Sequence, residues 1–462
     1  MISIAQFAGC RVHMVGIGGS SMNGLAHILK QRGYVVTGSD WADSPIVEKL
    51  RQNGIPVQIG NKGENVEGAA LLVFTAAAKE DNPERVYAAQ HGIPQMERSE
   101  LLGELLRGSK HAIGIAGTNG KTTTTSMVAT IFLKAGRDPT VHLGGQLDLI
   151  GGSMYAGTGE EFITEADEYV DTFLKFSCTT QAVTNIELDH LDFFEDLEDV
   201  YQSFLQFTQQ IPQKGGILIA NGDNAQCVRL MAECGKYSQS FGTTTQCDWY
   251  PTQIRIEGTK TLFTLHFRNK QVAKVTLSVT GAYNVLNAIC AIAVANFHGI
   301  APQTAADALS GFVNAHRRFE RSGTHASGAA VYNDYAHHPS AIKAVLETAK
   351  AITPGKIIAI FQPHTYSRTK TLFEDFAACF ALAGDVVLAD IYAAREPDTG
   401  LVHSEQLAQA ILQKQHCVYF STFEAIAEYV QSVATAQDTI LVIGAGDIVQ
   451  ICEKLIVTEV KI

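Results

Sequence analysis

Residues 112–127 read AIGIAGTNGKTTTTSM: an apolar segment, a turn with glycines, then Lys121 and a run of threonines. The apolar segment is typical of a buried strand, and the threonines stand where a helix would begin. A phosphate loop has this order of strand, glycine turn and helix, because the N–H groups at a helix N-terminus face an anion. Lys121 would bridge phosphates, and the Thr122 hydroxyl would reach a magnesium ion. The stretch therefore predicts a nucleotide-binding α/β unit.

The loop departs at one position from the common pattern G-x-x-x-x-G-K-[S/T]. That pattern places a glycine five residues before Gly120, and Ile115 stands there. The first glycine of the turn is instead Gly117. A coincidental match is the alternative, but the strand before the loop and the helix after it favour phosphate binding.

The composition fits a protein folded into several domains. The chain has 462 residues, of which 46% are hydrophobic and 18% charged, and its formal net charge is −12. A chain of this length is too long to fold around a single hydrophobic core, so three domains are expected. Nucleic-acid affinity comes mostly from lysine and arginine, so the negative balance argues against a nucleic-acid partner. It does not argue against a small anionic ligand in a local pocket.

The cysteines and the apolar segments indicate the compartment. Nine cysteines occur without any C-x-x-C pair, so neither a zinc knuckle nor a thioredoxin-type motif is indicated. Unpaired thiols fit a reducing cytosol. The N-terminal segment does not have the pattern of a signal peptide, and no window approaches the roughly 18 apolar residues of a membrane helix. We expect a cytoplasmic protein without a membrane partner, present as a monomer or a weak homodimer.

Strand and helix signals alternate in three blocks, which we place at 1–107, 108–315 and 316–462. The first block has apolar RVHMVG before glycines, then a helical period and a second strand in YVVTGSD, a βαβ order that predicts a parallel sheet. The second adds strands in EFITEADE, QAVTNIELDH and GGILIANGD, antiparallel strands within about 235–280 and an amphipathic helix over 281–299. The third block is again an α/β sheet, with strands in AAVYNDYAHHP, KIIAIFQPH, DVVLADIY, CVYFS and TILVIGAGD.

Polar residues at the ends of these strands are candidate site residues, because ligands bind beyond the carboxyl ends of parallel strands. In the second block they are Glu165, in TEADE, and His190, in TNIELDH. Carboxylate oxygens suit magnesium, whereas a histidine ligand is unusual for this ion. The alternative for each is structural, a solvated acidic loop for Glu165 and a surface or core histidine for His190.

The third block has a second group of strand-end residues. Asp334, His337 and His338 follow one strand, and His364 and Arg368 follow another. Two histidines and an arginine in such positions indicate an anion or carboxylate site. An exposed basic loop is the alternative.

Two further glycine turns are less specific. The segment from Gly16 to Ser21 resembles G-x-G-x-x-G, except that Ser21 stands at the third glycine, and Asp40 ends the next strand about twenty residues on, as in ribose-binding sites. This segment is either a binding site for a nucleotide diphosphate at a helix N-terminus or a tight turn that binds no ligand. GAGD at 444–447 is either a functional turn or a close packing turn.

Together these motifs resemble the Mur ligase family over essentially the whole chain. In chain order they are GIGGSSMNGLA, TGSD, KEDNPE, AGTNGKTTTTSM, EADE, TNIELDH, YNVLNA, HRRFE, NDYAHHP, FQPHTYSRT and GAGD. EADE and DYAHHP are shared by the alanine-adding branch of the family and by the branch that recycles a tripeptide. FQPHTYSRT and GAGD point more to the alanine-adding branch.

The resemblance implies three domains. A Rossmann-like N-terminal domain would bind the UDP of a sugar nucleotide, and a central P-loop ATPase-like domain with some antiparallel strands would bind ATP and Mg²⁺. A C-terminal Rossmann-like α/β domain would contact the amino acid and the nucleotide. The UDP contacts it implies are Gly18, Gly19, Ser20, Met22, Ser39 and Asp40.

The same resemblance implies the ATP, metal and catalytic residues. ATP contacts would come from Gly117, Thr118, Asn119, Gly120, Lys121, Thr122 and Thr123, with Asn284 and Asn287 at adenine, Arg318 at phosphate and Asp334 at the ribose. The metal ligands would be Thr122, Glu165 and His190, and the catalytic residues Lys121, His190, Arg318, His337, His364 and Arg368.

The activity that the resemblance implies is ATP-dependent amide ligation of L-alanine to the lactyl carboxylate of UDP-N-acetylmuramate, in peptidoglycan precursor synthesis. Transfer of the ATP γ-phosphoryl group would turn this carboxylate, a poor electrophile, into an acyl phosphate. The main burden is anionic charge, which Lys121, magnesium and Arg318 would neutralise. The alanine amine must arrive deprotonated, and either His337 or His364 is a candidate base. Domain closure is expected to assemble the site.

Three positions depart from the alanine-adding branch. Position 119 is Asn where His is usual, position 283 is Tyr where His is common, and position 365 is Thr where many members have Arg. The last departure places more of the carboxylate recognition on Arg368.

Three alternatives are set against this function. The nearest is a tripeptide-recycling ligase that uses UDP-N-acetylmuramate and L-Ala-γ-D-Glu-diaminopimelate. The family branches that add later amino acids often use a carbamylated lysine after the DH motif. No lysine occurs between Lys175 and Lys214, so this chain does not match those branches. An NAD-dependent oxidoreductase would leave Lys121, Glu165 and His190 unexplained. A UDP-sugar sensor without catalysis is disfavoured, because the phosphate and metal residues are all present.

Overall fold

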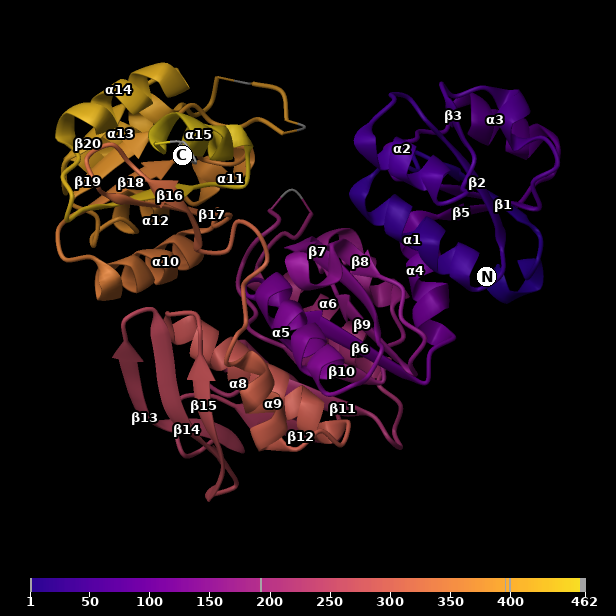
Figure 1. The fold of residues 1–462 in the computed structure, drawn as a ribbon, viewed down its shortest axis with the longest axis horizontal. Coiled ribbons are helices and arrows are strands. Elements are labelled where there is room, and N and C mark those ends of the chain that lie inside the picture. The colour runs from indigo at the N-terminus through magenta and orange to yellow at the C-terminus, as the bar shows by residue number, and fades with distance from the viewer. Residues whose placement is uncertain (1, 192, 395, 399, 458–462) are drawn as a thin grey trace, which may run out of the picture.

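The computed structural model describes residues 2–191, 193–394, 396–398 and 400–457, and its strands form three separate sheets. Figure 1 shows an N-terminal unit and a C-terminal unit that lie apart from each other, each beside a middle unit. Each sheet has helices packed on its faces, as the alternating strand and helix signals predict. The predicted α/β architecture is confirmed.

The N-terminal unit is built on a parallel sheet of five strands in the order β3-β2-β1-β4-β5. This order places the carboxyl ends of β1 and β2 side by side at a topological switch point. Its elements are η1 (Ile4–Phe7), β1 (Arg11–Val15), α1 (Ser20–Gln31), β2 (Val35–Asp40), α2 (Pro45–Gln52), β3 (Val57–Ile59), η2 (Gly63–Val66), β4 (Leu71–Phe74), α3 (Pro83–Gln90), β5 (Gln95–Glu97) and α4 (Arg98–Arg107).

The middle unit has a sheet of ten strands in the order β15-β14-β13-β12-β11-β10-β6-β9-β7-β8. The strands from β13 to β7 pair in parallel, and β8 and the ribbon β13–β15 add antiparallel pairs. The predicted antiparallel strands are therefore confirmed. The elements up to β10 are β6 (His111–Ala116), α5 (Lys121–Lys134), β7 (Thr140–Leu147), η3 (Asp148–Ile150), β8 (Gly152–Tyr155), β9 (Glu161–Glu165), η4 (Tyr169–Lys175) and β10 (Thr180–Val183).

The second half of the middle unit contains the antiparallel ribbon β13–β15 and the buried helix α8. The elements are α6 (Leu197–Gln209), β11 (Ile217–Asn221), α7 (Ala225–Glu233), β12 (Ser238–Phe241), β13 (Trp249–Glu257), β14 (Lys260–Phe267), β15 (Lys270–Leu277), α8 (Ala282–Phe297) and α9 (Pro302–Leu309). The amphipathic prediction for α8 is wrong. Nearly every residue from Asn284 to Ala295 is buried, because α8 packs against the strands β10 to β13 and against the neighbouring helices α5 and α9.

The C-terminal unit has six strands in the order β16-β17-β21-β18-β19-β20, all parallel except β16. Its elements are β16 (Glu320–Thr324), β17 (Ala330–Asp334), α10 (Pro339–Ile352), β18 (Ile357–Phe361), α11 (Tyr366–Thr371), α12 (Phe373–Ala378), β19 (Asp385–Leu388), α13 (Ser404–Leu412), β20 (Cys417–Tyr419), α14 (Phe423–Val433), β21 (Thr439–Ile443), η5 (Asp447–Gln450) and α15 (Ile451–Leu455).

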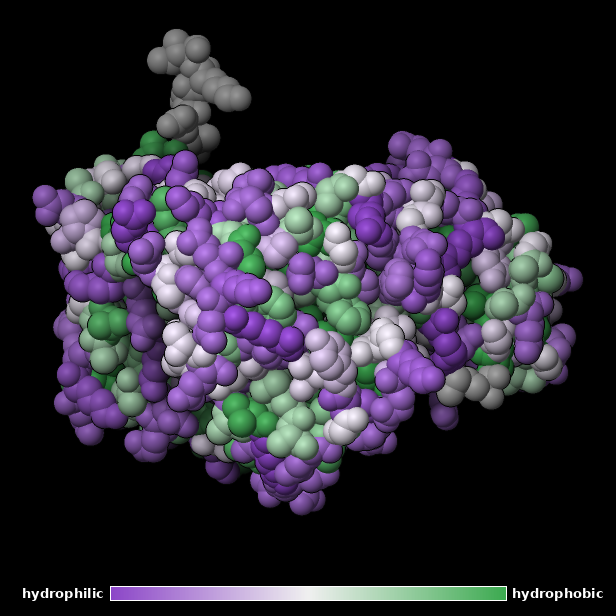
Figure 2. All heavy atoms as spheres, turned by 90° about the horizontal axis from the view of Figure 1, so that it is seen from below, coloured by the Kyte–Doolittle hydropathy of each residue, from purple (hydrophilic) through white to green (hydrophobic). Residues whose placement is uncertain are grey.

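The surface and the helix lengths agree with the composition. In Figure 2 hydrophilic side chains cover much of one face, and hydrophobic side chains appear singly or in small groups. Among the described residues, no helix has both the length and the apolar character needed to cross a bilayer. The apolar side chains instead fill several cores against the three sheets, and one of these cores runs from the N-terminal sheet to a face of the middle sheet.

Candidate functional site

A cleft of ≈ 830 Å³ lies between the middle unit and the C-terminal unit. Its walls are the carboxyl ends of the middle strands and the loops after β17, β18 and β21. The sequence-predicted residues that line it are Thr118, Asn119, Gly120, Lys121, Thr122, Thr123, Glu165, Asn287, His190, Arg318, Asp334, His337, His364 and Arg368. The cleft thus brings together most of the predicted ATP, metal and catalytic residues from segments far apart in the chain.

The phosphate loop is fixed by its own glycines and by the strand beside it. Gly117 has φ +129°, and a Cβ there would lie 2.1 Å from Oγ1 of Thr184, so only glycine fits. The Asn119 N–H donates to Oδ1 of Asn185 at 2.9 Å, and Asn185 Nδ2 donates back to the Asn119 carbonyl at 2.9 Å. The loop then enters α5 with its N–H groups towards the cleft. This geometry suits an anion.

Lys121 lies among carboxylates at the start of α5. Its Nζ is 2.8 Å from Oε2 of Glu168 and 3.8 Å from Oδ1 of Asp167. Burial lowers the pKa of the Lys121 ammonium, but the carboxylates of Glu168, Asp167 and Glu165 together outweigh burial, and the net pKa is raised. Lys121 is therefore a permanent cation in the cleft at neutral pH.

Oxygen donors for a cation surround the same helix N-terminus. Oγ1 of Thr122 donates to Oε2 of Glu165 at 2.9 Å, and ligand atoms of Asp167, Glu168 and His190 lie within 4.8 Å of one another. Magnesium prefers carboxylate and hydroxyl oxygens, so this donor set fits Mg²⁺. Burial lowers the pKa of His190, which keeps the ring neutral. The predicted set omitted Asp167 and Glu168 as ligands.

The wall opposite the phosphate loop contributes a second cation. Nη2 of Arg318 donates to Oγ1 of Thr122 at 3.0 Å, across the boundary between the C-terminal and middle units. Asp334 accepts backbone N–H groups from Phe319 and Ala336, each at 2.7 Å, and its burial raises its pKa. Arg318 therefore already points at the phosphate loop, while Asp334 holds the chain that carries Arg318.

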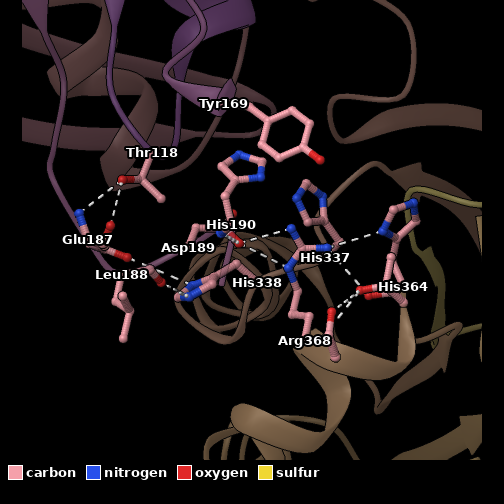
Figure 3. Close-up of polar contacts among 12 residues, drawn as sticks. Thr118, Tyr169, Glu187, Leu188, Asp189, His190, His337, His338, His364 and Arg368 are labelled. Atoms are coloured by element: carbon pink, nitrogen blue, oxygen red, sulfur yellow. Dashed lines mark hydrogen bonds and ion pairs between the residues drawn. The ribbon is translucent and has the colours of Figure 1, made fainter. Parts of the chain in front are cut away.

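Arg368 links the C-terminal unit to the middle unit through a buried ion pair. Its Nε and Nη2 groups donate to Oδ1 of Asp189 at 3.0 and 2.9 Å, and both side chains are buried. Its Nη1 group contacts Nδ1 of His364 at 3.1 Å. Figure 3 shows the Arg368 guanidinium between Asp189 and His364, with His337 beside it. Most of the guanidinium donors are thus occupied within the protein.

The histidines next to this ion pair are neutral. Burial, followed by the Arg368 charge, lowers the pKa of His337 to about 3 and that of His364 to about 4. Their ring centroids are 5.8 Å apart, and both rings line the cleft. Neutral imidazoles have one acceptor nitrogen each, which is what an acid–base site requires.

A second contact joins the phosphate loop directly to α10. Asn119 Nδ2 lies 3.3 Å from both Oε2 of Glu187 and Oγ of Ser340, and Ser340 donates to Glu187 at 2.6 Å. His338 caps α10 and reaches the Leu188 carbonyl at 3.2 Å through Nε2. Asn119, one of the three departures, therefore contacts the C-terminal unit. His338 serves the same boundary rather than the open cleft.

The two predicted adenine asparagines lie at different depths in α8. Asn287 lines the cleft, and a Cβ on Gly120 would lie 2.9 Å from its Oδ1. Asn284 is buried and donates to the Thr280 carbonyl at 2.6 Å. Asn284 Oδ1 in turn lies 3.4 Å from Nδ2 of Asn287. Only Asn287 is therefore in position to touch a ligand, and Asn284 supports it.

The predicted UDP residues lie in the N-terminal unit, outside the main cleft. Gly18, Gly19 and Ser20 form the turn into α1, and the Gly18 N–H donates to Oδ2 of Asp40 at 2.8 Å. Ser39 and Met22, by contrast, have buried side chains. The Ser39 hydroxyl donates to the buried Glu84 carboxylate at 2.6 Å. Glu84, the last residue of KEDNPE, thus accepts a hydrogen bond from Ser39 and fixes the carboxyl end of β2.

Three family models match the chain in consecutive segments. They are described as "Mur ligase family, catalytic domain" over residues 11–110, "Mur ligase middle domain" over 115–295 and "Mur ligase, glutamate ligase domain" over 317–446. The chain belongs to the Mur ligase family. The resemblance inferred from the sequence motifs is therefore confirmed.

Similar proteins place this Mur ligase more narrowly. It is 41% identical over 448 residues to UDP-N-acetylmuramate–L-alanine ligase of Caldanaerobacter subterraneus subsp. tengcongensis, covering 96% of this chain and 97% of that protein. It is 42% identical over 445 residues to the enzyme of the same name from Clostridium acetobutylicum, covering 96% of each.

Two solved structures have the same three-unit fold. A UDP-N-acetylmuramate–alanine ligase from Thermotoga maritima has a TM-score of 0.78 at 27% identity, covering 96% of this chain and 98% of that one. A murein peptide ligase from Psychrobacter arcticus has a TM-score of 0.67 at 27% identity, covering 97% and 98%.

Sequence reasoning missed several residues of the Mur ligase cleft. Asp189 and Glu187 stand in TNIELDH, and Glu168 ends EADE, so each lies in a motif from which only one residue was chosen. The signal was their position at a strand end. Ser340 gave no such signal, because its role depends on the placement of α10 against the phosphate loop. The departure Thr365 caps α11, which carries Arg368, and does not line the cleft.

Proposed function

We propose that this Mur ligase joins L-alanine to the lactyl carboxylate of UDP-N-acetylmuramate, with ATP converted to ADP and phosphate. The proposal is supported by full-length similarity to curated ligases that carry this name. It is also supported by the higher TM-score to the alanine ligase than to the murein peptide ligase at equal identity. The tripeptide-recycling activity is the second candidate, and the shared EADE and DYAHHP motifs are what favour it.

One observation carries the chemistry: the cleft joins a phosphate loop to a separate wall with an arginine and two neutral histidines. A nucleotide hydrolase needs only the first of these. A ligase must also hold a carboxylate and an amine next to the transferred phosphoryl group. The wall with the arginine and the histidines could hold that carboxylate and amine. It lies next to the phosphate loop, because Nη2 of Arg318 is 3.0 Å from Oγ1 of Thr122.

The first step is phosphoryl transfer from ATP to the lactyl carboxylate. Both reactants are anions, so charge neutralisation and positioning dominate the barrier. Lys121 and Arg318 enter from opposite walls and are expected to neutralise the transferring group, and the N–H groups of the loop hold the phosphates in line. Thr122, Glu165, Asp167, Glu168 and His190 would hold Mg²⁺. The ion would offset phosphate charge when it is bound.

The second step is attack of the alanine amine on the acyl phosphate. The carbon–nitrogen bond forms, the bond between the acyl carbon and the phosphate oxygen breaks, and phosphate leaves. Closure of the C-terminal unit excludes water, which would otherwise hydrolyse the intermediate. The contacts of Asn119 with Ser340 and of Asp189 with Arg368 are expected to hold this closed arrangement.

We also infer a cytoplasmic enzyme, present as a monomer or weak homodimer. All nine cysteines are free thiols, and eight of them are buried, which fits a reducing compartment. The nucleotide substrates and the magnesium ion are the expected small-molecule partners.

Phosphate release tests the proposed function. The protein is incubated with ATP, Mg²⁺ and UDP-N-acetylmuramate, together with either L-alanine or L-Ala-γ-D-Glu-diaminopimelate. We expect release with alanine, because the relatives that carry the alanine-ligase name match over the full length. Release with the tripeptide alone would reassign the enzyme to recycling. No release with either amine would contradict the ligase proposal itself.

A further inference from the structure

The hydrogen bonds of the cleft histidines fix which ring nitrogen of each carries the proton. A guanidinium can only donate, and a carbonyl can only accept. A neutral imidazole has one N–H donor and one acceptor nitrogen, so the partner of one nitrogen determines the state of the other. This rule separates His337 and His364, which the sequence left as equal candidates for the base.

His337 has its acceptor nitrogen towards the cleft. Its Nδ1 lies 3.0 Å from the Tyr335 carbonyl oxygen, so Nδ1 carries the proton and donates. Nε2 therefore has the free lone pair. None of the residues in the described ranges hydrogen-bonds this Nε2, and the ring lines the cleft.

His364 has the opposite tautomer. Its Nδ1 lies 3.1 Å from Nη1 of Arg368, which can only donate, so Nδ1 is the acceptor and Nε2 carries the proton. The Asp189 carboxylate holds Arg368 in this position through Nε and Nη2. The cleft-facing nitrogen of His364 is thus a donor, suited to an anionic substrate oxygen and unable to take a proton.

His338 is excluded by the same rule. Its Nδ1 accepts from the Ser340 N–H at 3.4 Å, so its Nε2 donates to the Leu188 carbonyl at 3.2 Å. Both of its nitrogens are engaged at the boundary between units. Within the described parts of the chain, His337 is the one histidine of these three whose acceptor nitrogen has no hydrogen-bond partner.

We propose that Nε2 of His337 is the general base that deprotonates the alanine ammonium, and that Nε2–H of His364 binds an anionic oxygen of the substrate. Burial and Arg368 lower the pKa of His337 in the protein alone, and the negative charge of a bound nucleotide and acyl phosphate would oppose that shift. This assignment rests on the proposed ligase function. The alanine ammonium gives one proton to His337, and the freed lone pair attacks the acyl carbon. As the carbon–nitrogen bond forms and the carbon–oxygen bond to phosphate breaks, the second amine proton leaves with the phosphate as its monohydrogen form.

The test replaces alanine by hydroxylamine, which is uncharged near neutral pH and needs no base before it attacks. His337→Asn keeps an N–H donor for the Tyr335 carbonyl and has no atom at Nε2. Loss of a general base costs about 10²- to 10⁴-fold, so alanine-dependent kcat should fall by that factor. Hydroxamate formation from the same acyl phosphate should fall far less. His337→Gln is measured beside it in case one variant does not fold.

A matched control and His364 complete the experiment. His91 is exposed in the N-terminal unit and makes the same contact, from Nδ1 to a carbonyl, so His91→Asn should alter neither reaction. His364→Gln, which keeps an N–H near the Nε2 position, should raise the KM for alanine less than His364→Asn.

Three outcomes would count against these proposals in different ways. Parallel losses with alanine and hydroxylamine in both His337 variants would overturn the base assignment. The base assignment would also be overturned if His364→Gln lost the reaction with alanine but kept the reaction with hydroxylamine, while His337→Asn did not show this difference. A wild-type protein that forms neither product would contradict the proposed function instead.

Discussion

Lys121→Ala is expected to lower kcat by about 10³-fold, because one preorganised charge on a transferring phosphoryl group contributes at that level. The raised pKa keeps Lys121 charged, and its Nζ lies 3.4 Å from the Thr118 carbonyl oxygen of the phosphate loop. The substitution also leaves Glu168 without its ammonium partner 2.8 Å away, and because burial already raises the pKa of Glu168 to about 7, this carboxyl would be protonated near neutral pH. Phosphate release in the presence of L-alanine measures the loss.

The matched control for this prediction lies on the same helix. Lys134 is at the other end of α5, where its Nζ donates to the Ala308 carbonyl at 2.9 Å, far from the loop. Lys134→Ala should retain turnover. Calorimetric binding of UDP-N-acetylmuramate should be nearly the same in both variants, since the predicted UDP residues belong to another unit. If Lys121→Ala lost sugar-nucleotide binding and turnover equally, the division of labour between units would be wrong.

Asp189→Ala is expected to cost about 3–5 kcal/mol of stability, because it leaves the buried Arg368 charge without its partner. Both side chains are buried, and the pair spans the boundary between the middle and C-terminal units. The loss should therefore appear as a lower midpoint for the unfolding of the C-terminal unit in calorimetry. It should also raise the KM for alanine, since Arg368 orients His364.

An exposed ion pair provides the comparison. Lys454 and Glu424 are 2.9 Å apart with both side chains exposed, so Glu424→Gln should leave the stability nearly unchanged. The double variant Asp189→Ala with Arg368→Leu should be more stable than Asp189→Ala alone, because the unpaired charge is gone. An equal or lower stability of the double variant would show that the pair is not coupled.

The pH dependence of this pair follows from the same contact. Burial raises the pKa of Asp189, but the groups around the carboxylate, Arg368 first among them, together outweigh burial and hold the folded-state pKa well below the usual value of about 4. The pair therefore contributes stability at all pH values above about 4 and loses it as the pH falls further. Wild type should lose more stability between neutral pH and acid than Asp189→Asn does.

Much of the cleft could be predicted from strand ends. Glu165 and His190 were chosen because each follows a strand, and β6, β9 and β10 are parallel neighbours, so their carboxyl ends meet at one edge. The phosphate loop could likewise be predicted from the local order of a strand, a glycine turn, Lys121 and a helix. These residues line the same cleft, and their positions there follow from the direction of single strands.

Contacts across the boundary between units could not be predicted in that way. Asp189 and Arg368 are 179 positions apart, and Asn119 and Ser340 are 221 apart, in different sheets. Their pairing depends on how two separately folded units dock, which no local periodicity records. For the same reason the sequence does not determine the tautomers of His337 and His364, which depend on their hydrogen-bond partners in the structure.

The helix α8 shows a different limit. Its sequence places asparagines and small apolar residues around a helical period, which suggested one polar face. The asparagines at 284 and 287 are instead buried near the phosphate loop, and the rest packs on all sides. A helix with so few charged residues is better interpreted as fully enclosed.

The enclosure of α5 and α8 has a consequence for how the cleft accommodates its ligands. The phosphate loop opens directly into α5, and Asn287 of α8 lies against Gly120, so neither piece can shift without disturbing a close-packed core. Induced fit is therefore confined to the other wall. We therefore expect the middle unit to present a fixed surface to the nucleotide, and the loops that follow β17 and β18 to adapt to the acceptor and the amine.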